Sequence, residues 1–303
     1  MGIKFGGIES GGTKFVCAIG SGPDDLTEVK IIPTGKPDET ISEVIEFFDP
    51  FNSNDSLEAI GISSFGPLDL DHDSATHGYI KATPHRETAK KDWVEIDLLG
   101  PIKRAINVPI TLDTDVNGAA IGEHRWGAGN GYDNLIYITV GTGVGGGAIV
   151  NGRIAHGLIH PEMGHMRVPH DWKADPFPGR CPFHGDCVQG LANAPAIEER
   201  WGARCDELPD DHPAWDLEAY YLSLMVSNLV FSLSPEILIL GGGVMQRNQL
   251  ITKIQANVSK FLGGYVQSDR VINNIDSFVV LPGLGSMSGV LGGIAMAQDL
   301  VRD

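Results

Sequence analysis

The chain has 303 residues, which is long enough for two domains that each bury a core. Its formal net charge of -17 argues against nucleic acid or an anionic membrane as a partner, because such polyanions would be repelled. The N-terminus lacks the apolar core of a signal peptide and no apolar run is long enough to span a membrane, so we expect a cytoplasmic protein.

The first predicted element is a hairpin with a glycine-rich turn. Residues 3–9 (IKFGGIE) and 15–19 are predicted as strands, joined by the turn SGGTK. A P-loop requires G-x-x-x-x-G-K-[ST] before a helix, whereas here Gly12 is followed by Thr13 and Lys14, and a strand comes next. Because glycine lets an anion approach the backbone N–H groups closely, the turn is a candidate phosphate site.

A strand over 109–113 then leads into a helix that is predicted to begin near Asp115, within VPITLDTDVNGAAIGEHRWG. Asp113 and Asp115 are both candidate N-caps, and capping is the commonest use of Asp at such a junction. The functional alternative is that one of these carboxylates is a general base, which an alcohol needs when it attacks a phosphoryl group.

A second hairpin is predicted over LIYITV (135–140), GTG (141–143) and VGGGAIV (144–150). One such hairpin alone would be a tight turn. Two similar hairpins far apart in the chain predict a duplicated, two-lobed fold that clamps a phosphate chain. The run GTGVGG also fits the dinucleotide pattern G-x-G-x-x-G, which we reject because here it opens a strand and not a helix.

A metal site is the strongest local prediction. The segment CPFHGDC supplies Cys181, His184 and Cys187 in a C-x2-H-x2-C pattern, and His165 lies upstream in HPEMGH. Four nitrogen and sulfur ligands are the closed set of structural zinc, with no position left for water. The metal is therefore predicted to pin a loop that also carries Glu162, a candidate acceptor for substrate hydroxyls.

The last motif is LILGGGV (238–244), which ends a strand predicted to begin near Glu236. The residues that follow have helical spacing. A triple-glycine junction lets a flat ring lie close to the backbone, and an ordinary strand-to-helix turn is the alternative.

The order of GGTK, SFGPLD, TDVNGAA, GTGVGGG, HPEMGH, the cysteine cluster and LGGGV resembles that of the ROK family of sugar kinases, over essentially the whole chain. Within this family the chain is most similar to the bacterial fructokinase branch. Its metal cluster is C-P-x-H-G-D-C, where glucokinases commonly have a cysteine-rich form, and ESGGTKF replaces the more usual D-x-GGTK.

The resemblance implies an α/β protein of the actin-like, hexokinase-like ATPase fold (ribonuclease H-like), with two lobes around a nucleotide and sugar cleft. The first lobe would span 1–117 and the second 118–285 with the zinc-binding loop, and a C-terminal helix over 286–303 would pack back on the first lobe. ROK proteins are commonly dimers, so a homodimer is expected.

The resemblance also implies residue roles. Asp115 takes the place of the catalytic base, and Glu9 the place usually held by Asp near Mg²⁺. The implied nucleotide-binding residues are Glu9, Gly11, Gly12, Thr13, Lys14, Gly141, Thr142, Gly143, Ala194, Gly241, Gly242 and Gly243. The implied substrate-binding residues are Gly66, Pro67, Thr83, Asn117, Glu162, Gln189 and Gly190. Structural zinc would be held by His165, Cys181, His184 and Cys187.

Two positions depart from the family pattern. Gln189 stands where a Glu that reaches the sugar is often found, and an amide can donate as well as accept but carries no charge. Ala194 stands where a Gly is common beside the nucleotide, and its methyl group is tolerated if φ is negative there.

The implied reaction is phosphoryl transfer from Mg·ATP to D-fructose, giving fructose 6-phosphate and ADP, with Asp115 as the base. Glucokinase, mannokinase and N-acetylhexosamine kinase activities are the alternatives within the family, and a non-catalytic sugar sensor is a further one. A DNA-binding repressor is disfavoured, because the chain begins almost directly with the first hairpin and is acidic.

Overall fold

The computed structural model describes residues 4–53, 56–81 and 91–302. The chain forms two compact units, one of residues 1–130 with 286–303 and one of residues 131–285. Helix α4 (Asp115–Trp126) belongs as a whole to the first unit, because it packs along the C-terminal helix α10 (Ser288–Arg302). The division between the units therefore follows α4 and does not fall at residue 117.

The first unit is built on a five-stranded sheet in the order β3-β2-β1-β4-β7. Strand β2 pairs antiparallel with both β1 and β3, whereas β1, β4 and β7 run parallel. The strands are β1 (Lys4–Ser10), β2 (Lys14–Gly20), β3 (Leu26–Pro33), β4 (Leu57–Ser64) and β7 (Ile110–Thr114), with β5 (Tyr79–Ile80) paired to β6 (Ile96–Asp97) apart from them. The remaining helical segments are α1 (Pro37–Asn52), η1 (Lys91–Trp93) and α3 (Leu99–Ala105).

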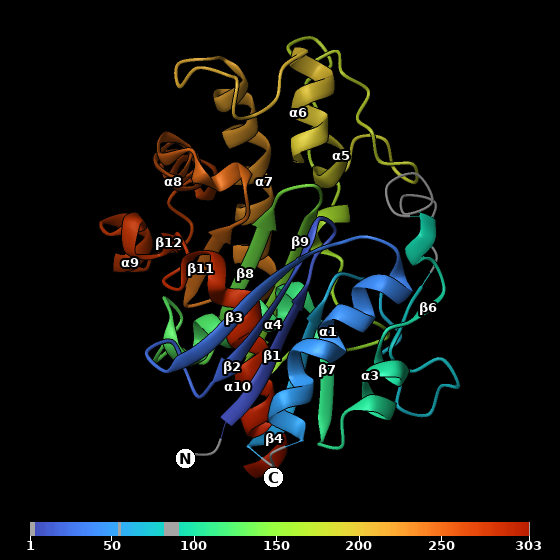
Figure 1. The fold of residues 1–303 in the computed structure, drawn as a ribbon. Helices are drawn as coiled ribbons and strands as arrows, with labels where there is room; N and C mark the ends of the chain where they lie inside the picture. The colour runs from blue at the N-terminus through green and yellow to red at the C-terminus, as the bar shows by residue number, and fades with distance from the viewer. Residues whose placement is uncertain (1–3, 54–55, 82–90, 303) are drawn as a thin grey trace. The chain divides into compact units, whose positions relative to one another are not determined.

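Helix α10 lies directly on the central strands of this sheet, and Figure 1 shows it in red against the blue strands. Gly61 in β4 makes this possible, because a Cβ there would collide with the backbone carbonyl of Gly293 in α10. Gly118 in α4 and Gly292 in α10 meet in the same way. The C-terminal helix is thus held at backbone distance from both the sheet and the helix that carries Asp115.

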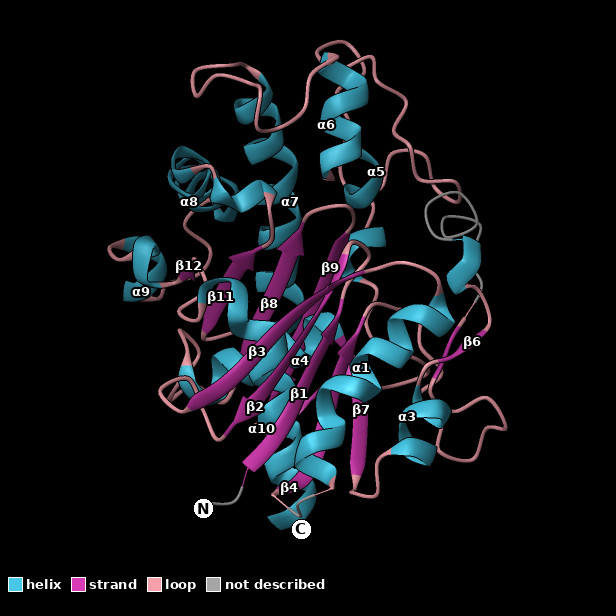
Figure 2. Ribbon diagram, in the orientation of Figure 1, coloured by secondary structure: helices cyan, strands magenta, loops and turns pink. Residues whose placement is uncertain are grey.

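The second unit repeats this topology with a sheet in the order β10-β9-β8-β11-β12. Figure 2 shows its strands in magenta and its helices in cyan. The strands are β8 (Leu135–Val140), β9 (Val144–Val150), β10 (Arg153–Ile154), β11 (Ile237–Gly241) and β12 (Val279–Val280). The helical segments are η2 (Met163–His165), α5 (Val188–Ala192), α6 (Ala194–Trp201), α7 (Ala214–Leu233), η3 (Val244–Gln246), α8 (Asn248–Leu262), α9 (Asp269–Ile272) and η4 (Ile275–Ser277). A further segment, η5 (Gly285–Met287), begins at the last residue of this unit and continues into the first unit.

The core of the second unit lies between this sheet and the long helix α7. Trp215 and Tyr221 of α7 are fully buried there, with Ile138 and Leu240 from the two central strands. Burial of side chains of this size contributes about 1.5–3 kcal/mol each. Both glycine hairpins form as predicted, β1–β2 and β8–β9, and each continues into parallel strands. The duplicated α/β fold predicted from the two hairpins is therefore confirmed.

Candidate functional site

Three parallel strands of the first unit end at one edge of the sheet. The register pairs Ser10 of β1 with Ser64 of β4, and Ser64 with Thr114 of β7. The glycine turn, the segment that begins at Phe65, and Asp115 therefore all leave the sheet at the same edge. Ligands of α/β proteins bind at the carboxyl ends of parallel strands, so this edge is the candidate site of the first unit.

The first glycine turn presents backbone amides at its tip. Gly11 donates its N–H to the carbonyl of Lys14 at 3.0 Å, and the hydroxyl of Thr34 donates to the carbonyl of Gly11 at 2.8 Å. In the part of the chain that the structure describes, the next two amides, of Gly12 and Thr13, have no protein acceptor. Two adjacent N–H groups beside the exposed Lys14 are suited to bind a phosphate oxygen.

The start of α4 corrects one expectation. The N-cap is neither Asp113 nor Asp115 but Thr114, whose Oγ1 accepts a hydrogen bond from the N–H of Asn117 at 3.2 Å. The predicted start of the helix at Asp115 is confirmed. Asp115 lies in the first turn, where the helix dipole favours a carboxylate, and it is only partly buried.

The two candidate carboxylates differ in their surroundings. Asp113 is buried, and its Oδ1 accepts from the N–H of Thr114 and from Nδ2 of Asn117, both at 2.7 Å. Asn117 is itself fully buried, and the structure places its amide on Asp113, whereas the sequence placed it beside the sugar. The Oδ1 atom of Asp115 accepts a local hydrogen bond from the N–H of Val116 at 2.9 Å.

Glu9 lies beside Asp115 at the end of β1. Burial, and then the charge of Asp115, raise the pKa of Glu9 from 4.5 to about 7, while Lys14 and the backbone of Val290 oppose the shift. The negative charge of Asp115 thus disfavours the charged form of Glu9, and a cation would offset this effect.

The donors at this edge fit a magnesium ion. The Oε2 atom of Glu9 is buried and lacks a hydrogen-bond partner within the described residues. Packing leaves this carboxyl little freedom, since a Cβ on Gly289 would lie 2.5 Å from its Cδ atom. Oxygen ligands from one or two carboxylates are the usual protein contribution to a magnesium site.

The predicted sugar-side residues of the first unit are placed only in part. Gly66 and Pro67 follow β4 and are joined by a cis peptide bond. The carbonyl of Pro67 accepts from the N–H of Lys81 at 2.8 Å. Thr83 and Pro84 lie outside the described residues.

The turn of the second hairpin also presents backbone amides at its tip. Gly141 donates its N–H to the carbonyl of Gly143 at 2.8 Å, which closes the turn. Within residues 91–302, the amides of Thr142 and Gly143 have no protein acceptor, and Thr142 is exposed. Each hairpin thus offers two adjacent amides to an anion.

Three predicted nucleotide motifs of the second unit meet at Gly141. The N–H of Ala194, the first residue of α6, donates to the carbonyl of Gly141 at 2.8 Å. A Cβ on Gly141 would lie 4.0 Å from the nitrogen of Gly243, in the triple-glycine segment. Gly242 has φ of +94° and packs against the backbone of Val140, so only glycine fits there.

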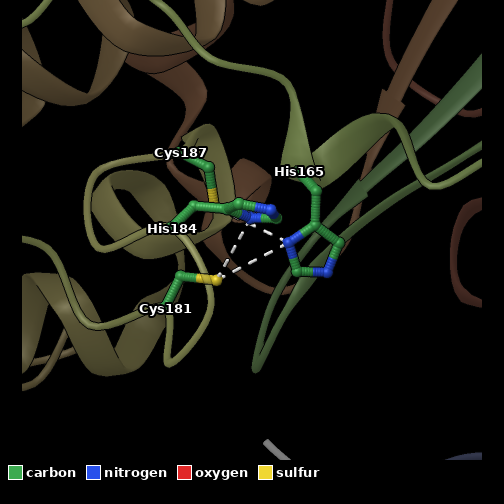
Figure 3. A group of neighbouring side chains, drawn as sticks. All are labelled: His165, Cys181, His184 and Cys187. Atoms are coloured by element: carbon green, nitrogen blue, oxygen red, sulfur yellow. Dashed lines mark hydrogen bonds between the residues drawn. The ribbon is translucent and has the colours of Figure 1, made fainter. Parts of the chain in front are cut away.

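The four predicted zinc ligands come together in one cluster, shown in Figure 3. Their donor atoms all lie within 4.8 Å of one another. The Nδ1 atom of His165 is 3.6 Å from the sulfur of Cys181 and 3.7 Å from that of Cys187, and Nδ1 of His184 is 3.7 Å from the sulfur of Cys181. A tetrahedral zinc ion would separate nitrogen and sulfur donors by about 3.5 Å, so the cluster fits the metal.

A short loop fixes three of these ligands. Cys181 and Gly185 exchange two backbone hydrogen bonds, of 3.1 and 2.8 Å, around His184. Gly185 has φ of +64°, the left-handed conformation that glycine adopts without strain. Cys187 then occupies the position before the first residue of α5, Val188.

The chemistry of the thiols also favours a metal over a nucleophile. Burial raises the pKa of Cys187 to about 12, so the bare thiol stays protonated near neutral pH. A bound cation stabilises the thiolate, which is the ligand form. The donor set is therefore compatible with structural zinc.

Polar residues that sequence reasoning had missed support this loop. Asp186 lies next to Cys187 and pairs with Arg167 at 2.9 Å and with Nδ1 of His170 at 3.3 Å. His170 also contacts the carbonyl of Asp175 at 3.0 Å. No spacing rule predicts these partners, because the loop between them is irregular.

Glu162 is exposed just before η2, with its carboxylate 3.6 Å from Nδ1 of the buried His160. His160 was not predicted as a site residue, although it lies only two residues before Glu162 in the chain. Gln189 and Gly190 lie on α5 and face neighbouring backbone. The Oε1 atom of Gln189 accepts from the N–H of Val144 at 3.2 Å, and a Cβ on Gly190 would collide with Gly185.

Among the described residues, the helices are too short or too polar to cross a membrane.

Comparison with known proteins identifies the family to which the sequence is similar. The sequence model described as the ROK family matches residues 5–300. A protein of Bacillus subtilis (strain 168) that carries the fructokinase name provisionally is 43% identical over 297 residues, covering 98% of this chain and 96% of the relative. A fructokinase of Lactococcus lactis subsp. cremoris is 39% identical over 301 residues, covering 99% of each chain.

Solved structures agree on the fold. The crystal structure of a ROK hexokinase from Thermus thermophilus superposes with a TM-score of 0.79 at 24% identity, covering 99% of this chain and 100% of that one. The actin-like ATPase fold expected from the sequence is thereby confirmed.

Proposed function

The chain belongs to the ROK family, and on that basis we propose that it is an ATP-dependent fructokinase, which forms fructose 6-phosphate and ADP. The observation that carries this proposal is the pair of carboxylates at one sheet edge. Asp115 directly follows β7 and Glu9 lies near the end of β1, close to a turn with two available amides, and Thr114 supplies the N-cap of the helix that Asp115 begins. Fructose is the first choice because relatives that are 43% and 39% identical over nearly their full length carry the name fructokinase.

In the proposed mechanism, the amides of Gly12 and Thr13 and those of Thr142 and Gly143 bind phosphate oxygens of ATP. Lys14 adds a positive charge next to the first turn. Asp115 accepts the proton of the attacking sugar hydroxyl as the γ-phosphoryl group is transferred. The protein contributes mainly position and electrostatics, because phosphoryl transfer needs little covalent chemistry from side chains.

Two metals fit the donors described. Mg²⁺ would be held by Glu9 with Asp115 nearby, and when bound it neutralises charge on the phosphates. Zinc would be held by His165, Cys181, His184 and Cys187 and would be structural, because all four donors come from the protein. On the sugar side we propose Gly66, Pro67, Thr83 and Glu162.

We further propose a cytoplasmic homodimer that uses ATP and a hexose and binds neither nucleic acid nor a membrane. The net charge of -17 supports the last part, because polyanionic partners would be repelled.

The test is identification of the product. Zinc-loaded protein is incubated with Mg·ATP and fructose, and the sugar phosphate is assigned by phosphorus NMR. We expect fructose 6-phosphate. ATP consumption with phosphate release but no sugar phosphate would refute the proposal, and so would a product formed from glucose or mannose but not from fructose.

A further inference from the structure

The side chain of Gln189 is committed to the second glycine turn. It is 9% exposed, and its Oε1 atom accepts a hydrogen bond from the N–H of Val144 at 3.2 Å. Val144 is the first residue of β9, directly after the turn at 141–143. This contact joins residues that are 45 positions apart in the chain.

The same oxygen lies against the turn itself. A Cβ on Gly143 would be 2.9 Å from Oε1 of Gln189, closer than a real side chain sits. The amide of Gln189 therefore touches the turn at two consecutive residues. Because an amide oxygen is neutral, it accepts the N–H of Val144 without placing a negative charge beside the proposed phosphate site.

The other end of the turn is held from the same segment. Ala194, which follows α5, donates its N–H to the carbonyl of Gly141 at 2.8 Å. The bond from Gly141 to Gly143 then closes the turn. With both ends fixed, the two amides at the tip, of Thr142 and Gly143, are held in place before an anion arrives.

This brace is continuous with the metal-binding loop. Helix α5 starts directly after Cys187, and the N–H of Val188 donates to the carbonyl of Met166 at 3.0 Å. On the other side, Gly164, next to His165, packs against the carbonyl of Val144 so closely that no Cβ fits. The segments next to the metal ligands His165 and Cys187 thus both contact Val144, at the end of the turn.

We propose that Gln189 is a positioning residue for nucleotide binding, which holds the 141–144 turn in the conformation that binds phosphate, and that it is not a sugar contact. The metal-binding loop anchors α5 and thereby sets the position of Gln189. This inference rests on the proposed function, because it assigns the turn to the nucleotide.

The test compares two variants of the zinc-loaded, full-length protein. Gln189→Met keeps the length but removes the acceptor, whereas Gln189→Glu keeps an acceptor oxygen. We expect Q189M to raise KM for ATP by roughly threefold to tenfold, the worth of one hydrogen bond, and to leave KM for fructose within about twofold. Hydrogen exchange at the Val144 amide should accelerate in Q189M and stay near wild type in Q189E.

The opposite split would overturn the inference, namely a raised KM for fructose with an unchanged KM for ATP. Equal exchange at Val144 in both variants would overturn it as well. Calorimetric binding of a non-hydrolysable ATP analogue requires no sugar turnover. If the wild type phosphorylates no sugar but Q189M binds the analogue more weakly, the proposed function falls and the positioning role stands. If Q189M does not fold, Gln189→Asn, which is too short to reach Val144, takes its place with the same expectations.

Discussion

Glu9 and Asp115 are electrostatic neighbours at the carboxyl edge of the first sheet. Burial, and then the charge of Asp115, raise the pKa of Glu9 to about 7. The two carboxylates come from different elements, β1 and α4, and only the fold brings them together. Their unequal surroundings suit unequal roles, with Asp115 as the base and Glu9 as the group that faces a cation.

Replacement of Asp115 by Asn tests the role as base. The substitution keeps the size of the side chain and removes its proton affinity, so kcat should fall by roughly 10²–10⁴-fold. Binding of ATP, measured by calorimetry, should stay within a few fold of the wild type. Turnover at the wild-type rate would remove Asp115 from the mechanism.

Asp113→Asn is the matched control. Asp113 is buried and accepts hydrogen bonds from Asn117 and Thr114, so its loss of charge should cost roughly 1.5–3 kcal/mol of unfolding free energy. Turnover of the folded fraction should change much less than in D115N. If D113N and D115N lose activity equally, the separation of the two roles is wrong.

Glu9 gives the protein a specific dependence of stability on pH. Since the folded-state pKa of Glu9 lies near 7, above the ordinary 4.5, the folded protein binds the proton more tightly than the unfolded chain. Stability from this group is fully present below about pH 4.5 and is lost as pH rises through 7, by up to about 3 kcal/mol. Glu9→Gln should therefore raise the melting temperature of the metal-free protein at pH 8 and not at pH 4.

The same variant should lose its response to magnesium. In the wild type at pH 8, added Mg²⁺ should recover part of the lost stability, because the cation offsets the two carboxylates. The account of Glu9 would be contradicted if the wild type and E9Q had the same melting temperature at pH 8 both without Mg²⁺ and with it.

Loss of one cluster ligand should release the metal. Cys187→Ser should reduce bound zinc, measured by inductively coupled plasma mass spectrometry, and lower the melting temperature by about 5–10 °C. The control is Cys205→Ser, which changes a half-buried thiol outside the cluster and should keep the zinc content. Unchanged zinc in C187S would undo the metal assignment.

Adjacent glycines in the triple-glycine segment should respond differently to alanine. Gly242 has φ of +94° and no room for a Cβ, so Gly242→Ala should destabilise the protein by more than about 2 kcal/mol. Gly243 has φ of −64° and open space around its Cβ position, so Gly243→Ala should fold as stably as the wild type. G243A should still raise KM for ATP, because its methyl group would meet the nucleotide. An unchanged KM would move the nucleotide away from Gly243.

Local patterns in the sequence were sufficient for the hairpins and the metal cluster. A turn such as GTG between two apolar, glycine-containing or β-branched runs specifies its own geometry, because neighbouring residues alone determine it. The same holds for Cys181, His184 and Cys187, which one short loop brings together. The choice of Asp115 over Asp113 depended on the family resemblance, and the N-cap was predicted wrongly because Asp and Thr are both good caps.

The remaining features depend on contacts between distant parts of the chain. No periodicity links Gln189 to Val144, or Glu9 to Val290 in the C-terminal helix. The family resemblance implied that the C-terminal helix packs on the first lobe, but it did not reveal the close contact of Gly61 in the sheet with the backbone of Gly293 in α10. Such tertiary contacts decide which polar groups are buried, and hence which carboxyl groups have a shifted pKa.

The most direct test of the central claim is a coupled assay of ADP release by the zinc-loaded protein with Mg·ATP against fructose, glucose, mannose and N-acetylglucosamine. We predict sugar-stimulated turnover with the highest kcat/KM for fructose. The absence of stimulation by any of the four sugars, in protein shown to be folded and metal-loaded, would contradict the assignment as a sugar kinase.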